Sequence, residues 1–150
     1  MPKEKPLTQA EVDWLDRMLG LRDFLPVDSP EALKASLPSL TLLACAKGEE
    51  LVREGEQGTE LFILYKGALS VRRKGWLLSK EVGRLAPGDI FGEVGFLVQS
   101  PRSATVLAAG EGEVFRLESS DMEKVLNENP RLARKLSEQA GERMSKLTGG

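Results

Sequence analysis

From Ser39 onward the chain is a series of short apolar segments separated by glycines, and this pattern limits the possible folds more than any other feature. The segments occupy residues 39–46, 49–54, 60–66, 68–73, 77–85, 89–91, 103–109 and 113–118. Short segments with glycine at the breaks are typical of antiparallel strands joined by tight turns, whereas parallel strands need longer helical crossovers. We therefore expect about eight antiparallel strands that close into a roll or barrel.

Two helices are predicted before this region. A capping-box pattern begins at Thr8 and precedes apolar residues at helical spacing, so a helix is expected over residues 9–19, closed by Gly20. Ser29, followed directly by proline, is a second start signal, for a short helix that ends near Pro38.

Two more helices are predicted after the strands. Residues 119–121, Ser-Ser-Asp, are expected to cap one helix, and Pro130 is expected to open a longer one. The longer helix carries an apolar stripe of Leu132, Leu136, Ala140, Met144 and Leu147. Such a stripe is typical of a core or a dimer seam, so this helix is a candidate homodimer surface.

The composition is that of one domain. With 150 residues and 41% hydrophobic content, the chain can bury a core. We distinguish an N-terminal helical segment (1–38), a β-roll (39–118) and a C-terminal helical region (119–150).

The charge and the apolar content of the sequence limit the classes of partner that we expect. The formal net charge is −2, which gives no general attraction to nucleic acid or to an anionic membrane. Three consecutive cations at residues 72–74 are interpreted as a solvated hairpin turn. The N-terminus lacks the apolar run of a signal peptide, and no stretch is long enough to span a bilayer. The single cysteine, Cys45, lies in an apolar run and is interpreted as a small buried residue. We expect a cytoplasmic protein with neither a DNA nor a membrane partner.

Residues 91–106 hold the candidate binding site. They place one acid, Glu93, and one base, Arg102, nine positions apart in a stretch that is otherwise apolar or small. An arginine stays charged at ordinary pH, so its burial beside a strand is costly without an anion. Gly92 and Gly95 would let backbone approach a ligand closely. The pattern suits a ligand with an anionic group for Arg102 and a hydroxyl for Glu93, such as a sugar phosphate.

This stretch resembles the phosphate-binding cassette of the cyclic nucleotide-binding domain family, whose pattern reads F-G-E-aliphatic-A-L and then P-R-x-A-T/S-V. The matching residues are Phe91, Gly92, Glu93, Val94, Leu97, Pro101, Arg102, Ala104, Thr105 and Val106. Gly95 and Phe96 replace the alanine and leucine of the family pattern. The resemblance runs from about Ser39 to Pro130.

The resemblance implies a mainly β fold with flanking helices, namely an eight-stranded antiparallel jelly roll (a double-stranded β-helix) with N- and C-terminal helices. It implies that Arg102 pairs with the cyclic phosphate and that Glu93 accepts a hydrogen bond from the ribose 2′-hydroxyl. The implied ligand-binding residues are Phe91, Gly92, Glu93, Val94, Gly95, Arg102, Ser103 and Ala104. The C-terminal helices would act as hinge and lid, and the candidates for covering the base are Arg131, Leu132, Arg134 and Lys135.

We therefore expect a regulatory sensor that binds a cyclic purine nucleotide, with 3′,5′-cyclic AMP preferred, and that acts on an unidentified effector protein without a further cofactor. Cyclic GMP is the alternative ligand, and a degenerate roll that serves as a protein-interaction scaffold is an alternative function. A barrel-shaped isomerase or dioxygenase is disfavoured, because the sequence has no histidine and no paired general acid and base.

Overall fold

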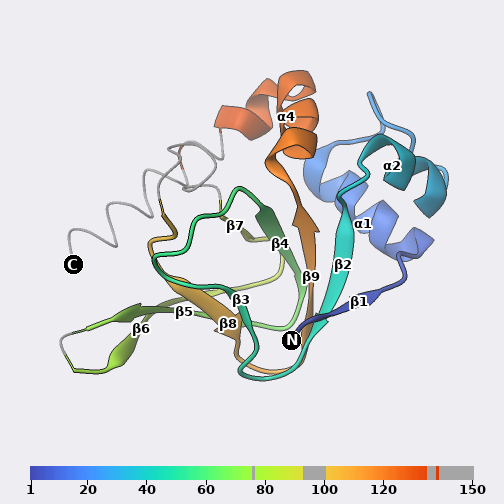
Figure 1. Cartoon of the computed structure of the whole chain (residues 1–150). Coiled ribbons are helices and arrows are strands. Elements are labelled where there is room, and N and C mark those ends of the chain that lie inside the picture. Colours follow the sequence, from blue (N-terminus) through green and yellow to red (C-terminus); the bar gives the residue numbers. More distant parts are fainter. Residues whose placement is uncertain (76, 93–100, 135–137, 139–150) are drawn as a thin grey trace.

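The computed structural model describes residues 1–75, 77–92, 101–134 and 138, and in it two antiparallel sheets form a roll with helices at one side (Figure 1). The five-stranded sheet has the order β1 (Lys3–Lys5), β2 (Thr41–Cys45), β9 (Gly112–Leu117), β4 (Leu61–Lys66) and β7 (Ile90–Phe91). The four-stranded sheet has the order β3 (Glu50–Val52), β8 (Thr105–Ala108), β5 (Leu69–Lys74) and β6 (Ser79–Leu85).

The mainly β fold with flanking helices is confirmed, and each of the eight predicted segments contains a strand. One further strand was not predicted. β1 is the charged sequence Lys-Glu-Lys, which lacks an apolar pattern and is exposed throughout. It forms because its backbone pairs with the edge of β2, from Lys3 opposite Ala44 to Lys5 opposite Leu42. Pairing of this kind depends on main-chain groups rather than side chains, so no hydrophobic pattern announces it.

The N-terminal helices begin and end at residues that the caps predict. In α1 (Gln9–Leu19), the Thr8 backbone N–H and hydroxyl both donate to the Glu11 carboxylate, at 3.1 and 2.6 Å. Gly20 closes α1 in the left-handed conformation, with φ of 65°. In α2 (Pro30–Ser36), the Ser29 hydroxyl accepts a hydrogen bond from the backbone of Ala32 at 3.1 Å.

The predicted cap of the next helix, α4 (Ser119–Glu128), is wrong by one residue. Glu118 is the N-cap, and residues 119–121 are already helical. The side chain of Asp121 turns to a distant serine, Ser39, instead of the helix end. Residues 130–134 are helical again, as the start signal at Pro130 predicts. None of the helices in the described ranges is long and apolar enough to span a membrane.

Strand β4 separates two apolar cores. Leu61 and Ile63 face a core built with the helices, whereas Phe62 and Leu64 face a second core inside the roll. The alternation follows from the two-residue period of a strand, and both faces are buried because helices cover one and the second sheet covers the other. Figure 1 shows α1, α2 and α4 gathered at the side of the sheet that contains β4.

Trp14 anchors α1 to this sheet. Its ring lies 5.0 Å from that of Tyr65 on β4 and 5.9 Å from that of Phe115 on β9. The geometry with Tyr65 is edge-to-face and that with Phe115 is stacked, both favourable arrangements of aromatic quadrupoles. Trp14 thus packs between the N-terminal helical region and the five-stranded sheet.

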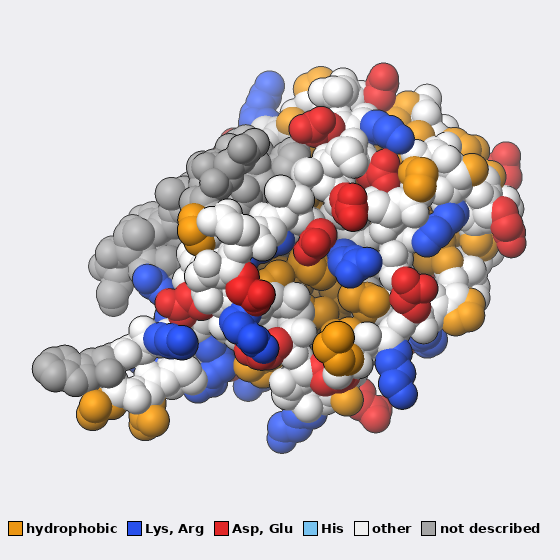
Figure 2. Space-filling model, viewed as in Figure 1, with side chains coloured by type: hydrophobic (Ala, Val, Ile, Leu, Met, Phe, Trp, Pro, Cys, Tyr) orange, Lys and Arg blue, Asp and Glu red, His pale blue; other side chains and the backbone are white. Residues whose placement is uncertain are grey.

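The hairpin of β5 and β6 projects from the roll as a long two-stranded arm (Figure 1). Six of the seven residues of β6 are exposed, and on the β5 side the backbone N–H of Lys74 donates to the carboxylate of Glu54, in the loop before β4, at 2.8 Å. Figure 2 shows hydrophobic side chains at its end and Lys or Arg side chains behind them.

The carboxylate of Asp121 joins α4 to the segment that precedes β2. It is 5% exposed and accepts from the Ser39 backbone N–H at 2.8 Å and from the Ser39 hydroxyl at 2.5 Å. The Lys124 ammonium lies 3.2 Å away. Burial alone would raise the pKa of Asp121, but these hydrogen bonds and the ammonium together hold its pKa below the ordinary value.

Asp121→Asn is expected to lower the free energy of unfolding at neutral pH by about 1–3 kcal/mol, because it leaves the half-buried Ser39 donors poorly paired. Since the folded-state pKa is depressed, the stabilisation is present above the unfolded pKa of about 3.9 and is lost as pH falls through the folded value. Urea denaturation should therefore show a wild-type advantage at neutral pH that narrows in acid. The control is Glu123→Gln, an exposed acid on the same helix. Equal effects of the two substitutions would contradict the assigned role of Asp121.

Candidate functional site

Arg102 is a buried cation held by main-chain oxygens. Its side chain lies just before β8, and the residue is 6% exposed. Nη1 donates to the carbonyl of Gly92 at 3.1 Å, and Nη2 donates to the carbonyl of Glu60 at 2.9 Å. Gly92 follows β7 and Glu60 precedes β4, so the guanidinium links the four-stranded sheet to two neighbouring strands of the other sheet.

Glu60 also supplies an acidic side chain near this cation. Its Oε2 lies 3.9 Å from Nη2 of Arg102, which is longer than a hydrogen bond. The Glu60 side chain is 40% exposed, so water screens its charge in part. Glu60 therefore lowers the cost of burying the guanidinium without a direct charge-assisted bond to it.

Two glycines make room for the guanidinium. A Cβ at Gly58 would lie 2.7 Å from Nη2 and 2.9 Å from Nε of Arg102. A Cβ at Gly92 would lie 2.8 Å from Nη1 and 2.6 Å from the Glu60 carbonyl oxygen, and Gly92 has a φ of +93°. Any side chain at either position would enter the space that Arg102 occupies. The cation is thus enclosed by backbone that only glycine allows to approach so closely.

The main chain of Arg102 is fixed as firmly as its side chain. Its N–H donates to the carbonyl of Glu56 at 2.8 Å, and its carbonyl accepts from Gly55 at 2.8 Å. Three residues later, the hydroxyl of Thr105 accepts from the backbone of Glu54 at 2.9 Å. The loop between β3 and β4 therefore runs alongside the segment that enters β8 and holds it in place.

The remaining residues predicted for the site fall into two groups. Phe91 is buried in the roll interior, stacked on Phe62 with ring centres 4.8 Å apart, while Ala104 is buried and Ser103 is half-buried. The structure thus brings Gly92 directly against Arg102 and sets Ser103 and Ala104 between Arg102 and β8. Three predicted residues lie outside the described ranges: Glu93, Val94 and Gly95.

The candidates for covering a base lie beyond α4. Leu132 is 7% exposed and belongs to the core between the helices and the five-stranded sheet. Asn129, the C-cap of α4, donates to the carbonyl of Leu19 at 2.9 Å and so ties this region to the end of α1. Arg131 and Arg134 are exposed, and Lys135 lies outside the described residues.

Sequence reasoning missed two residues of the site. Gly58 is one of the glycines at the breaks between the predicted strands, and neither it nor Glu60 was singled out. Neither contact with Arg102 has a periodic signal, because closure of the roll brings together residues more than forty positions apart. The only signal was the glycine-rich run 55–58, which lies within the region that resembles the family.

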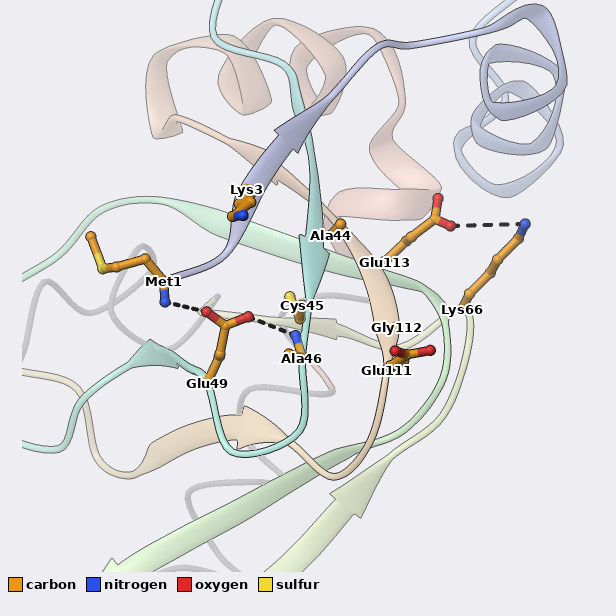
Figure 3. Close-up of a pocket in the computed structure, with 10 residues that line it drawn as sticks. All are labelled: Met1, Lys3, Ala44, Cys45, Ala46, Glu49, Lys66, Glu111, Gly112 and Glu113. Carbon is orange, nitrogen blue, oxygen red and sulfur yellow. Dashed lines mark hydrogen bonds and ion pairs between the residues drawn. The ribbon is translucent and has the colours of Figure 1, made fainter.

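A separate cavity of about 660 Å³ opens beside the β2–β3 and β8–β9 turns (Figure 3). Glu49, Glu111 and Glu113 line it, and Arg102 does not. Lys3, Lys66 and the terminal ammonium of Met1 line it as well, so its charges balance and give no net attraction to a phosphate. Cys45 also lines it, and burial raises the pKa of this thiol to about 11, so the thiol is neutral and a poor nucleophile at neutral pH. The interpretation of Cys45 as a small buried residue is confirmed.

Comparison with known proteins identifies relatives by sequence. The chain is 42% identical over 79 residues to the cAMP-dependent protein kinase regulatory subunit of Mycosarcoma maydis. The aligned stretch is 53% of this chain but only 15% of that subunit, so the chain corresponds to a small part of the relative.

Solved structures share the fold. The regulatory domain of Toxoplasma gondii PKA, crystallised with cAMP, matches 80% of this chain and 46% of its own, with a TM-score of 0.65 and 24% identity. A cyclic nucleotide-binding domain from Methylobacillus flagellatus matches 98% of this chain and 84% of its own, with a TM-score of 0.68 and 17% identity. At these identities the likeness concerns the fold.

The model of the cyclic nucleotide-binding domain matches residues 42–129, which is more than half of the chain. The matched region contains Arg102, the glycines that enclose it and the strands that support them. The chain therefore belongs to the cyclic nucleotide-binding domain family.

Proposed function

We propose that this domain binds a cyclic purine nucleotide, preferentially 3′,5′-cyclic AMP, and acts as a regulatory sensor for a partner protein. The proposal rests on the buried guanidinium of Arg102. This group donates to the carbonyl of Gly92, at the start of the cassette segment, and to the carbonyl of Glu60, directly before β4. A buried cation in a fixed position attracts an anion more strongly than an exposed one, because water screens it less.

The cyclic phosphate would approach Arg102 from the cassette. A guanidinium has five N–H donors in a planar fork, a geometry that suits two oxygens of one phosphate. Backbone N–H groups from residues 92 to 95 and near Ala104 would complete the anion site. Glu93 would accept from the ribose 2′-hydroxyl, which distinguishes a ribonucleotide from its deoxy counterpart.

The regulatory step would involve the helical region that begins at Pro130, beyond α4. A lid function for Leu132 would require it to leave the core where it is buried, while Arg131 and Arg134 are exposed and could reach a base without that change. A ligand that favours one of two positions of this region shifts the population by its difference in affinity for them. The hydrogen bond from Asn129 to Leu19 is the contact to follow in such a transition.

The preference for cyclic AMP rests on the relative and on one residue. The relative that is 42% identical over 79 residues is named as a cAMP-dependent regulatory subunit. The residue after the arginine is Ser103, where the resemblance associates threonine with cyclic GMP. Serine has the hydroxyl but no methyl group to fix its rotamer, so a hydrogen bond to a guanine amino group would be less well oriented.

Arg102→Ala is expected to weaken cyclic AMP binding roughly thirty-fold to several thousand-fold, because removal of one partner of a buried charge pair costs about 2–5 kcal/mol. Isothermal titration measures the loss, and circular dichroism checks the fold, since the substitution also leaves two carbonyls without their donor. Arg102→Lys keeps the charge but loses the planar fork, and should bind at least about tenfold more weakly than wild type. Wild-type affinity in both folded variants would refute the site.

Gly58→Ala tests whether the observed position of the Arg102 guanidinium matters for binding, without changing a charged residue. The new Cβ would displace Nη2 and Nε, since it would lie within 3 Å of both. We expect about tenfold weaker binding of cyclic AMP with the roll still folded, because a small misplacement of a binding group costs about 1.4 kcal/mol or more. The matched control is Gly83→Ala on β6, where an added Cβ meets nothing within 4 Å. If both alanines leave affinity unchanged, the observed position of Arg102 is not the binding position.

Competition titration should show that cyclic AMP binds more tightly than cyclic GMP. The expected margin is less than the several kcal/mol that dedicated hydrogen bonds to one base would give, because the candidates for covering the base, residues 131, 132, 134 and 135, include no acid that would select guanine. Ser103→Thr should narrow the margin by orienting the hydroxyl, and Ser103→Ala should widen it. A tenfold preference of the wild type for cyclic GMP would reverse the assignment of the base.

A further inference from the structure

The arm formed by β5 and β6 ends in an exposed apolar turn. Gly75 donates to the carbonyl of Leu78 at 2.9 Å, which closes the turn. Leu77 is 85% exposed and Leu78 is 81% exposed. Two adjacent leucines so fully in water are unusual for a folded domain, whose largest apolar side chains mostly find cover.

Cations surround the arm directly behind this turn. Lys74 pairs with Ser79 in the first row, and Arg73 pairs with Lys80 in the second. Residues that pair across an antiparallel hairpin share a face, and successive residues alternate. Arg73 and Lys80 therefore lie on one face of the arm, and Lys74 lies on the other.

The sequence of residues 69–85 contains five Lys or Arg and a single acid, Glu81. Glu81 already pairs with Arg84 at 3.2 Å and accepts from the Ser70 hydroxyl. Arg72 donates to the hydroxyl and carbonyl of Ser79, both at 3.2 Å, which stiffens the arm. The Glu54 carboxylate, from outside the arm, accepts from the backbone N–H of Lys74 at 2.8 Å. The residues of the arm itself carry a net positive charge, although the whole chain has a formal net charge of −2.

We propose that the β5–β6 arm docks tip-first on an anionic lipid bilayer. Leu77 and Leu78 would enter the acyl boundary, and the cations of the first two rows would contact lipid phosphates. Rows in a strand are about 3.3 Å apart, so both cationic rows lie within roughly 7 Å of the turn. The headgroup layer on each side of a bilayer is roughly 5–7 Å thick, which places these charges at the phosphates when the tip reaches hydrocarbon.

The distribution of charge favours a planar lipid surface over other partners. A groove on a protein would cover one face of the arm, whereas cations lie on both faces, which suits a medium that surrounds the tip. A second copy of the arm would bring like charges together. Nucleic acid would satisfy the cations but gives no reason for two exposed leucines.

The expectation of no membrane partner followed from the net charge of the whole chain. An arm that extends away from the body presents its own charge to a surface, because exposed charges more than about 10 Å apart are largely screened in salt. The proposal concerns attachment to a surface and does not depend on nucleotide binding.

Sedimentation with phosphatidylcholine vesicles, with and without phosphatidylserine, tests this proposal on the full chain. The wild type should partition onto the phosphatidylserine vesicles and lose most of this binding in high salt. Leu77→Ser with Leu78→Ser should reduce partitioning at least about tenfold, because the apolar insertion is removed. Lys74→Gln with Lys80→Gln should reduce it roughly thirty-fold, since each cation near an anionic surface contributes about fivefold.

The charge control is Arg17→Gln with Lys47→Gln, which removes two exposed cations away from the arm and should leave partitioning unchanged. Arg102→Ala should also bind vesicles normally, which separates this proposal from nucleotide binding. Wild-type binding by the leucine variant, or no binding by the wild type, would overturn the proposal. Two other results would also overturn the proposal. One is self-association of the wild type in sedimentation velocity that the leucine substitutions abolish. The other is binding to an oligonucleotide, without vesicles, that the lysine substitutions abolish and the leucine substitutions do not.

Discussion

The burial of β4 on both faces is the constraint on which the rest of the structure depends. Leu61 and Ile63 need the helices as cover, and Phe62 and Leu64 need the opposite sheet. No single sheet can satisfy both requirements, so the roll must close on one side and the helices must dock on the other. Glu60, directly before this strand, supplies the carbonyl that holds Arg102. The candidate site is therefore attached to one of the most buried elements of the molecule, where backbone positions vary least.

The environment of Arg102 determines what it costs to bind an anion there. Its hydrogen bonds to Gly92 and Glu60 satisfy donors that would otherwise be buried without partners. They also fix a side chain whose rotamer freedom is worth about 1.5–2 kcal/mol, so that an incoming phosphate does not have to order it. The distance of 3.9 Å to the Glu60 carboxylate matters as well. The Glu60 carboxylate, longer than a hydrogen bond away and partly solvated, neutralises the cation less than a direct, buried pair with this residue would.

The features that were predicted correctly from the sequence are those set by residues near one another in the chain. The short apolar segments separated by glycines, the capping box at Thr8 and the closure of the first helix at Gly20 each depend on residues close together in sequence, and all three appear as expected. The contacts that the sequence could not predict join distant parts of the chain. The carboxylate of Asp121 bonds Ser39 instead of capping its own helix, and Gly58 faces Arg102 across the closed roll. The strand β1 belongs to the same class, since it exists through backbone pairing alone. Residue type and spacing encode periodicity and caps, whereas such contacts emerge only when the sheets close.

Because the N-terminal helices complete a core, the residues needed for a stable fold extend beyond the residues that the family model matches. Residues 42–129 match the family model, yet Val12, Leu15, Leu33 and Leu37 complete one of the two cores from outside that range. A fragment cut at the family boundaries would keep every residue around Arg102 but would uncover Leu61, Ile63 and Phe115 on the outer face of the five-stranded sheet. Such a surface is a contiguous apolar patch, which favours aggregation or adventitious partners. The minimal ligand-binding sequence and the minimal stable protein are therefore different lengths of this chain.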